Sequence, residues 1–216
     1  MIKTGSKFYE SYFMRKYLIL ILIVHYFYLS CSFVTRTTYG AKKMKVQNEY
    51  SIKSWVQKYN LDTTNICSLK PSNYLEYFVE YFETPILFNN NGKFVSSGNC
   101  YKTFDDLLAN LTYTDKFKIA GINRNEDNPT FGAIFNPLVN VQGQPINSNQ
   151  LQANCDFILV LPFALALGNK IQVTDLKNYC KAAKTNKNVV IKIVFVNLDK
   201  QEWWGDEWNR KIKIDI

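Results

Sequence analysis

The sequence predicts an α/β or α+β fold in which helices flank a mixed β-sheet. Residues 156–161 form a continuous apolar run, and residues 189–196 form another that is rich in β-branched side chains, as expected of buried strands. An amphipathic helix predicted at 174–184 joins them, so the three segments are expected to form a β-α-β unit with parallel strands. A third observation is a hairpin pattern, in which the polar turn 89–92 separates two apolar runs at 86–88 and 93–97.

The segments before this unit are assigned from the spacing of their apolar side chains. Intervals of three and four residues predict amphipathic helices over 49–60 and 72–83, with a short strand at 65–69 between them. The buried face of the second helix is expected to consist of Tyr74, Leu75, Phe78, Val79 and Phe82. Thr103 is expected to cap a further helix, whose inward side chains would be Phe104, Leu107, Leu108 and Leu111.

Residues 123–154 hold three prolines and many Asn and Gln residues, which is typical of a long irregular connection. One short strand is expected inside it at 131–135, and another strand just before it at 117–122. Structureless loops of this length are uncommon in compact domains, so this one is expected to make contacts of its own.

The N-terminal residues have the pattern of an export signal. A basic segment precedes thirteen uncharged residues, Tyr17–Leu29, which is the length of a signal-peptide core. The following Leu29-Ser30-Cys31 resembles the lipobox of bacterial lipoproteins, which implies cleavage before Cys31 and lipid attachment to that residue. The expected organisation is a signal peptide at 1–30, a tether at 31–48 and a single domain at 49–216.

Two other arrangements fit the same residues. Tyr17–Val34 is an uncharged stretch of 18 residues, close to the ~20 that a membrane span needs, so an uncleaved signal anchor is one alternative. A simple cleaved signal is the other. All three place residues 35–216 outside the cytoplasm. The lipoprotein resemblance implies the bacterial cell envelope, on the periplasmic side or at the outer membrane, with the membrane as a partner through the N-terminal lipid.

Charge and histidine content exclude several classes of function. Removing residues 1–30 takes away four bases and one acid, which lowers the formal charge from +8 to +5, and it removes His25, the single histidine. A mature chain without imidazole excludes Ser-His-Asp and Cys-His nucleophiles and the usual zinc and non-haem iron sites. The sequence has no basic run with interleaved aromatics, which argues against nucleic-acid binding. The run 123–128 has oxygen ligands for calcium but lacks the spacing of a calcium loop. No catalytic residue, metal ligand or cofactor is therefore assigned.

Four further cysteines follow Cys31, and no two of them have the Cys-x-x-Cys spacing of a redox motif or a metal site. In an oxidising compartment they permit two disulfides, in any of three connectivities, among Cys67, Cys100, Cys155 and Cys180. Cys180 shares a helical stripe with Val173, Leu176 and Ala183, which predicts a buried core position for its thiol.

Two parts of the chain, Thr84–Val95 and Asp156–Gly168 with Val189–Asp199, resemble thioredoxin-like modules of bacterial lipoproteins. The first is similar to the hairpin that follows the cis-proline of that fold, and the second to its opening β-α-β unit. Their order is reversed here, which leaves two interpretations, a permuted domain of that fold or a likeness that is common to α/β proteins in general. Where a thioredoxin has two cysteines, this chain has Ala164-Leu165-Ala166-Leu167, so thiol redox chemistry does not follow from the resemblance. A cis peptide bond would cost little at Pro85.

The candidate contact site lies in the C-terminal tail, where tryptophans occur among acids: Glu202, Trp203, Trp204, Asp206 and Trp208. Sugars stack on aromatic rings and hydrogen-bond to carboxylates, so this composition suits glycan binding, and two carboxylates about 5–9 Å apart would suit glycoside hydrolysis. The other interpretation is that the tryptophans cover the sheet edge or the helix at 174–184. Asp105-Asp106, expected in the first turn of a helix, is interpreted as a complement to the helix dipole.

Together these observations predict a lipid-anchored envelope protein with a non-enzymatic role in binding or assembly, and an envelope protein or a glycan as partner. The alternative is an enzyme, either an envelope thiol oxidoreductase that uses isolated cysteines or a glycan hydrolase that uses the tail. The burial of the thiols and of the tail tryptophans discriminates between these interpretations.

Overall fold

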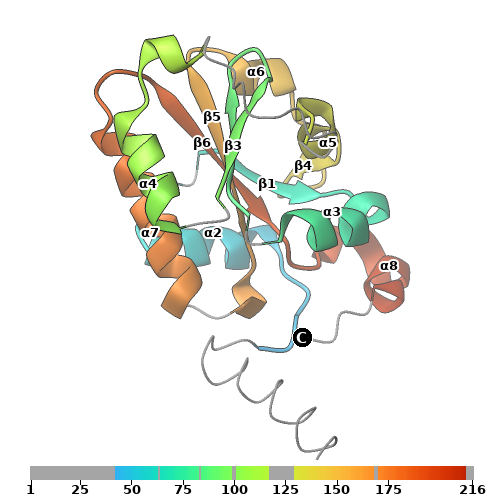
Figure 1. Cartoon of the computed structure of the whole chain (residues 1–216). Coiled ribbons are helices and arrows are strands. Elements are labelled where there is room, and N and C mark those ends of the chain that lie inside the picture. Colours follow the sequence, from blue (N-terminus) through green and yellow to red (C-terminus); the bar gives the residue numbers. More distant parts are fainter. Residues whose placement is uncertain are drawn as a thin grey trace, which may run out of the picture.

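The computed structural model describes residues 42–62, 64–82, 84–98, 101–116, 129–167 and 170–212. Its strands form one six-stranded sheet with the order β3-β2-β5-β6-β1-β4 (Figure 1). The strands are β1 (Ile66–Leu69), β2 (Ile86–Asn89), β3 (Phe94–Ser97), β4 (Leu138–Asn140), β5 (Phe157–Phe163) and β6 (Ile191–Asn197). Helices flank this sheet, so the predicted α/β class is confirmed.

The centre of the sheet is parallel and its margins are antiparallel. β6 pairs in parallel with β5 on one side and with β1 on the other. β2 lies antiparallel to β5 and forms a hairpin with β3, while β4 lies antiparallel to β1. The parallel β5–β6 pair and the β2–β3 hairpin are therefore confirmed as predicted.

The sheet is covered on both faces because its central strands are apolar on both sides. Along β5, Leu159 and Leu161 belong to one core and Ile158 and Val160 to the other, as the alternation of side chains in a strand requires. The first core is completed by α2 (Glu49–Lys58), α4 (Tyr101–Asn110) and α7 (Lys170–Thr185). The second is completed by α3 (Tyr74–Tyr81), α5 (Phe131–Phe135), α6 (Ser148–Gln152) and the C-terminal η4 (Glu202–Trp204) and α8 (Gly205–Lys211). Figure 1 shows these two sets of helices on opposite sides of the sheet. Three further 3₁₀ turns are η1 (Pro71–Asn73), η2 (Tyr113–Lys116) and η3 (Leu165–Leu167).

The prediction for the long connection was wrong in its described part. Residues 131–135 form the helix α5 instead of a strand, because Thr130 accepts a hydrogen bond from the N–H of Ala133 and so caps a helix. β4 and α6 follow within the stretch expected to be irregular. Lys192 of β6 holds the end of α6 by donating from Nζ to the carbonyl oxygens of Gln150 and Ala153.

The buried face of α3 also differs from the prediction. Tyr77 and Tyr81 are buried together with Tyr74, whereas Leu75 is exposed and Val79 is 81% exposed. The Tyr74 hydroxyl donates to the carbonyl oxygen of Leu198 at 2.6 Å, so a tyrosine satisfies a buried backbone acceptor that leucine or valine cannot.

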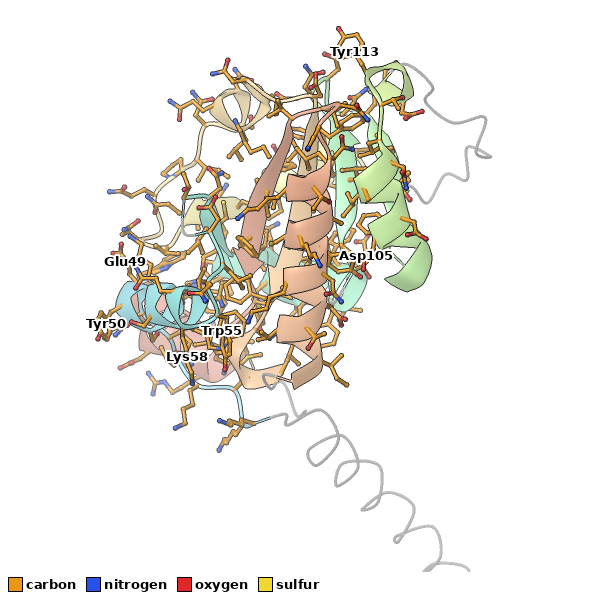
Figure 2. The ribbon with its side chains drawn as sticks, turned by 90° about the vertical axis from the view of Figure 1, so that its left-hand side faces the viewer. Glu49, Tyr50, Trp55, Lys58, Asp105 and Tyr113 are labelled. Atoms are coloured by element: carbon orange, nitrogen blue, oxygen red, sulfur yellow. The ribbon has the colours of Figure 1, made fainter. Side chains whose placement is uncertain are left out.

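α2 carries one exposed aromatic ring, and a smaller expectation is corrected at α4. Tyr50 points outward from α2 and is 81% exposed, while Trp55 of the same helix is buried (Figure 2). The helix α4 begins at Tyr101, before the expected cap at Thr103. Asp105 and Asp106 consequently lie beyond the first turn, where the helix dipole no longer explains them.

Several expectations fall on residues outside the described ranges. These are the signal peptide with Cys31, most of the tether, Cys100, the strand at 117–122 and the run at 123–128. Among the helices that the structure does describe, none combines the length and the apolar character that crossing a membrane requires.

Candidate functional site

The carboxyl ends of β5 and β6 meet at one edge of the sheet, the place where open α/β folds commonly bind ligands. Asp199 follows β6 at this edge and is 0% exposed. One carboxylate oxygen accepts hydrogen bonds from the backbone N–H of Leu165 at 2.7 Å and from Asn197 Nδ2 at 2.9 Å. The other accepts from the N–H of Ala166 at 3.3 Å. Asp199 therefore holds the turn that follows β5.

Side-chain amides complete this network. Gln201 Nε2 donates to Asn197 Oδ1 and to the backbone carbonyl oxygen of Asp199, both at 2.7 Å. From α7, Gln172 accepts from the N–H of Ala164 at 2.8 Å and donates to its carbonyl oxygen at 2.9 Å. Since the N–H groups of Ala164, Leu165 and Ala166 are bonded to the half-buried Gln172 and the buried Asp199, this edge of the sheet is closed by the chain itself.

Burial raises the pKa of Asp199 to about 6, although the hydrogen bonds from Leu165, Asn197 and Ala166 act to lower it. Asp199 lies in the interior, although it stands only a few residues before the exposed acids of the tail, Glu202 and Asp206. The available signal was its position, directly after a buried strand of a β-α-β unit.

The described cysteines do not form a redox site. Cys67, Cys155 and Cys180 are buried free thiols, as predicted for Cys180. Burial raises the pKa of the Cys67 thiol to about 12 and that of Cys180 to about 11. Thiol exchange requires the opposite, a thiolate of lowered pKa that solvent can reach.

We expect Cys67, Cys155 and Cys180 to resist alkylation by iodoacetamide in the native protein and to react fully in denaturant, because the neutral, buried thiol is a poor nucleophile. Peptide mass mapping after a timed reaction measures each position separately. Native labelling of any of the three at the rate of a free thiol would contradict the burial described here.

Trp204, one of the predicted contact residues, is part of the core. It is 5% exposed, and its ring meets that of Tyr74 edge to face at a centroid distance of 5.0 Å. Its Nε1 donates to the carbonyl oxygen of Leu69, the last residue of β1, at 3.1 Å. This ring covers the sheet, as the second interpretation of the tail proposed, and it cannot stack on a ligand.

The other predicted contact residues are half-buried or exposed, and the two tryptophans among them contact different neighbours. Trp203 is half-buried, and its ring lies so close to Gly143 that a Cβ at that residue would be 2.7 Å from ring atoms. Gly143 also has φ +83°, so a side chain at this residue is disfavoured both by the nearby ring and by the backbone conformation. Trp208 is half-buried with Lys211 Nζ 5.3 Å from its ring centroid, and Glu202 and Asp206 are exposed.

A cleft between α3 and α5 has walls from two separate elements, and its volume is about 230 Å³. Figure 1 shows α5 beside β4 and near α3 on one face of the sheet. α3 contributes two carboxylates and two phenols, from Glu76, Tyr77, Glu80 and Tyr81. The opposite wall is formed by Gly132, Ala133, Asn136 and Pro137.

The polar groups of this cleft are acidic or neutral. The Tyr81 hydroxyl donates to Glu80 Oε1 at 2.6 Å. Burial raises the pKa of the Tyr81 phenol, and its bond to Glu80 and the charges of Glu80 and Glu76 raise it further. Tyr77 is 2% exposed, and its buried hydroxyl has no hydrogen-bond partner among the described residues. The cleft therefore presents negative charge, whereas the Tyr77 hydroxyl is buried beneath its surface.

A second pair of carboxylates lies where α4 packs on α7. Burial and the charge of Asp106 raise the pKa of Asp105, and burial together with the charge of Asp105 raises that of Asp175. Figure 2 labels Asp105 on α4. The described residues contain no cluster of three or more His, Cys, Asp or Glu side chains that could hold a metal ion. Neither Asp105 nor Asp175 lines the α3–α5 cleft.

Comparisons of the chain with protein-family models, with curated proteins and with solved structures give no match. Function is therefore argued from the residues and the geometry of this chain.

Proposed function

We propose that this chain is a lipid-anchored protein of the bacterial cell envelope that acts in binding or assembly and not as an enzyme. The anchor is supported by the sequence alone, through the apolar stretch Tyr17–Leu29 and the lipobox-like Leu29-Ser30-Cys31. A mature chain that begins at Cys31 has no histidine, which removes the commonest general base from its chemistry.

We further propose that the domain is a permuted and degenerate thioredoxin-like module. The support is the relation between its two halves: the β2–β3 hairpin lies antiparallel beside β5, and β5, α7 and β6 form the parallel unit that follows it in sequence. One departure from that family is the Thr84–Pro85 peptide bond, which is trans, since none of the described residues has a cis bond.

The observation that carries the non-enzymatic assignment is the turn after β5. In a thioredoxin the reactive cysteines stand there, whereas this chain has the apolar Ala164–Leu167, bonded to Asp199 and Gln172. Ala164, Ala166 and Leu167 are buried. A segment without thiols and without free backbone donors offers neither a nucleophile nor an oxyanion site.

Intact mass of the protein recovered from a bacterial membrane fraction tests the anchor. We expect the mass of a chain that begins at Cys31 and carries covalent lipid, because a lipobox directs cleavage before an acylated cysteine. The matched control is Cys31→Ser, which should abolish acylation and leave the signal uncleaved.

Recovery of an unmodified chain that starts at Met1 in the cytosol would overturn the envelope assignment. A membrane-bound chain of full length would instead establish the signal-anchor alternative, and a soluble exported chain without lipid would establish the simple cleaved signal.

A further inference from the structure

We propose that a basic surface at the start of the folded domain lies against anionic lipid head groups. It consists of Lys42, Lys43 and Lys45 in the N-terminal strap (residues 42–47), Lys58 of α2 and Lys177 of α7, all of which are exposed. This orientation rests on the proposed lipid anchor and deepens it, because it states which side of the domain meets the membrane.

The strap is bonded along the edge of the sheet beyond β5 and β6. At one end, the N–H of Lys42 donates to the carbonyl oxygen of Ala166, in the turn after β5, at 2.6 Å. At the other end, the N–H of Gln47 donates to the carbonyl oxygen of Lys200 at 2.7 Å, and the Gln47 carbonyl oxygen accepts from the N–H of Glu202 at 2.8 Å. The point where the chain enters the described domain is therefore fixed at the carboxyl ends of the central strands (Figure 1).

Between these ends, one side of the strap faces the protein. Met44 is half-buried, and its Sδ lies 3.2 Å from the hydroxyl oxygen of Tyr74. Lys43 and Lys45, on either side of it in sequence, are exposed. The strap therefore turns its thioether inward and presents its ammonium groups to the surroundings.

α2 and α7 extend the positive charge beyond the strap. The Nζ atoms of Lys58 and Lys177 lie 5.4 Å and 5.8 Å from the centroid of one ring, that of Tyr59, although they come from different helices. Figure 2 shows Lys58 on the side of the molecule where the described chain begins. Within the described residues, the ion pairs involve Lys53 and Lys211 and none of the lysines of the basic surface. Positive charge gathered in this way, without acidic partners, attracts an anionic surface.

The length of the chain before the strap favours a membrane as that anionic surface. Cys31 precedes Lys42 by eleven residues. A fully extended chain spans at most about 3.6 Å per residue, so a lipid on Cys31 and the start of the strap are no more than ~40 Å apart. So short a connection keeps the strap side of the domain near the head groups and gives them a high effective concentration. A soluble polyanion has no such advantage.

Lysine footprinting on vesicles tests the orientation. The acylated protein from the membrane fraction is reconstituted into vesicles of phosphatidylcholine, alone or mixed with phosphatidylglycerol, and treated for a fixed time with the uncharged reagent N-hydroxysuccinimidyl acetate. Peptide mass mapping then measures the acetylation of each lysine. We expect the lysines of the basic surface to react about fivefold more slowly on the anionic vesicles, the factor expected for one lysine near an anionic surface. Raising the salt should abolish the difference, because it screens these charges.

Lys93 and Lys187 are the internal controls. Both are exposed, and both lie at the opposite edge of the sheet. Lys93 belongs to the turn of the β2–β3 hairpin, beside the residue that pairs with the first residue of β5, and Lys187 precedes the first residue of β6. Their acetylation should not depend on the lipid composition.

Removing charge gives a second readout. Lys58→Gln with Lys177→Gln should raise the acetylation of Lys42 on anionic vesicles about twofold or more, because the surface loses two of its charges. Lys93→Gln with Lys187→Gln is the matched control. It removes the same charge from the opposite edge and should leave the acetylation of Lys42 unchanged.

Equal acetylation on the two kinds of vesicle, equal protection of Lys93 and Lys187, or equal effects of the two double variants would each overturn the proposal. Protection of the same lysines by double-stranded DNA as strong as that by anionic vesicles would overturn it as well, since it would show a surface for polyanions in general. Intact mass separates this orientation from the anchor. A chain without lipid refutes both, whereas an acylated chain with uniform acetylation refutes the orientation alone.

Discussion

Replacing Trp204 by alanine is expected to lower the free energy of unfolding by roughly 3–5 kcal/mol, the range for truncating a large buried aromatic residue. The ring is buried against Tyr74, and its Nε1 bonds to the carbonyl oxygen of Leu69. The substitution opens a cavity under the C-terminal segment and leaves the carbonyl at the end of β1 without its donor. Urea unfolding of the variant beside the unchanged protein measures the loss.

Trp208→Ala is the matched control, since it truncates the same residue type four positions later. Trp208 is half-buried and contacts Lys211, so its loss is expected to cost no more than about 1 kcal/mol. Equal losses in the two variants would show that the tail packs as one unit. A small loss of unfolding free energy for Trp204→Ala would indicate that this ring lies at the surface. The tail would then again be a candidate glycan-binding surface.

The sequence predicted those strands whose signals are strong and favour a single structure. β5 and β6 are uninterrupted apolar runs with a helix between them, and few structures other than a parallel pair accommodate that pattern. α5 shows the opposite case. Its five residues, Phe131–Phe135, are too short for periodicity to separate a helix from a strand, and the side-chain cap of Thr130 decides the outcome.

The prediction for the buried face of α3 was wrong for a different reason. Hydropathy favours burial of Leu75 and Val79, but the buried carbonyl of Leu198, directly after β6, requires a donor. Tyr74 supplies one, and packing of the tyrosines then turns Leu75 and Val79 to the surface. A propensity scale considers only neighbouring residues and cannot predict this hydrogen bond, because its acceptor, Leu198, is 124 residues from Tyr74 in sequence.

Only one wall of the candidate cleft can be recognised in the sequence. The four-residue spacing of Glu76 and Glu80 is apparent there, but the opposite wall comes from Gly132–Pro137, and nothing local predicts that the two segments meet. The burial of Asp199 was hidden similarly: its acidic neighbours in sequence are at the surface, while its partners Leu165 and Ala166 come from the turn after β5.

Asp199 predicts how stability depends on pH. Its pKa is raised from 3.8 in the unfolded chain to about 6 in the folded protein, chiefly by burial. Between these values the folded state binds a proton that the unfolded state does not, so this group makes the protein more stable as pH falls from above 6 to below 4. The shift corresponds to about 3 kcal/mol.

Urea unfolding at pH 4, 5, 6 and 7, compared between the unchanged protein and Asp199→Asn, isolates this contribution. Asparagine preserves the shape and can accept from Leu165 and Asn197, but it does not titrate, so the difference between the two unfolding free energies should change by about 2 kcal/mol over this range, the rest of the effect lying below pH 4. Asp206→Asn, at an exposed position, should leave the profile as it is. A constant difference for Asp199→Asn would show that this carboxylate titrates normally, and that the edge beyond β5 and β6 is open to water. The turn after β5 would then be accessible to a substrate.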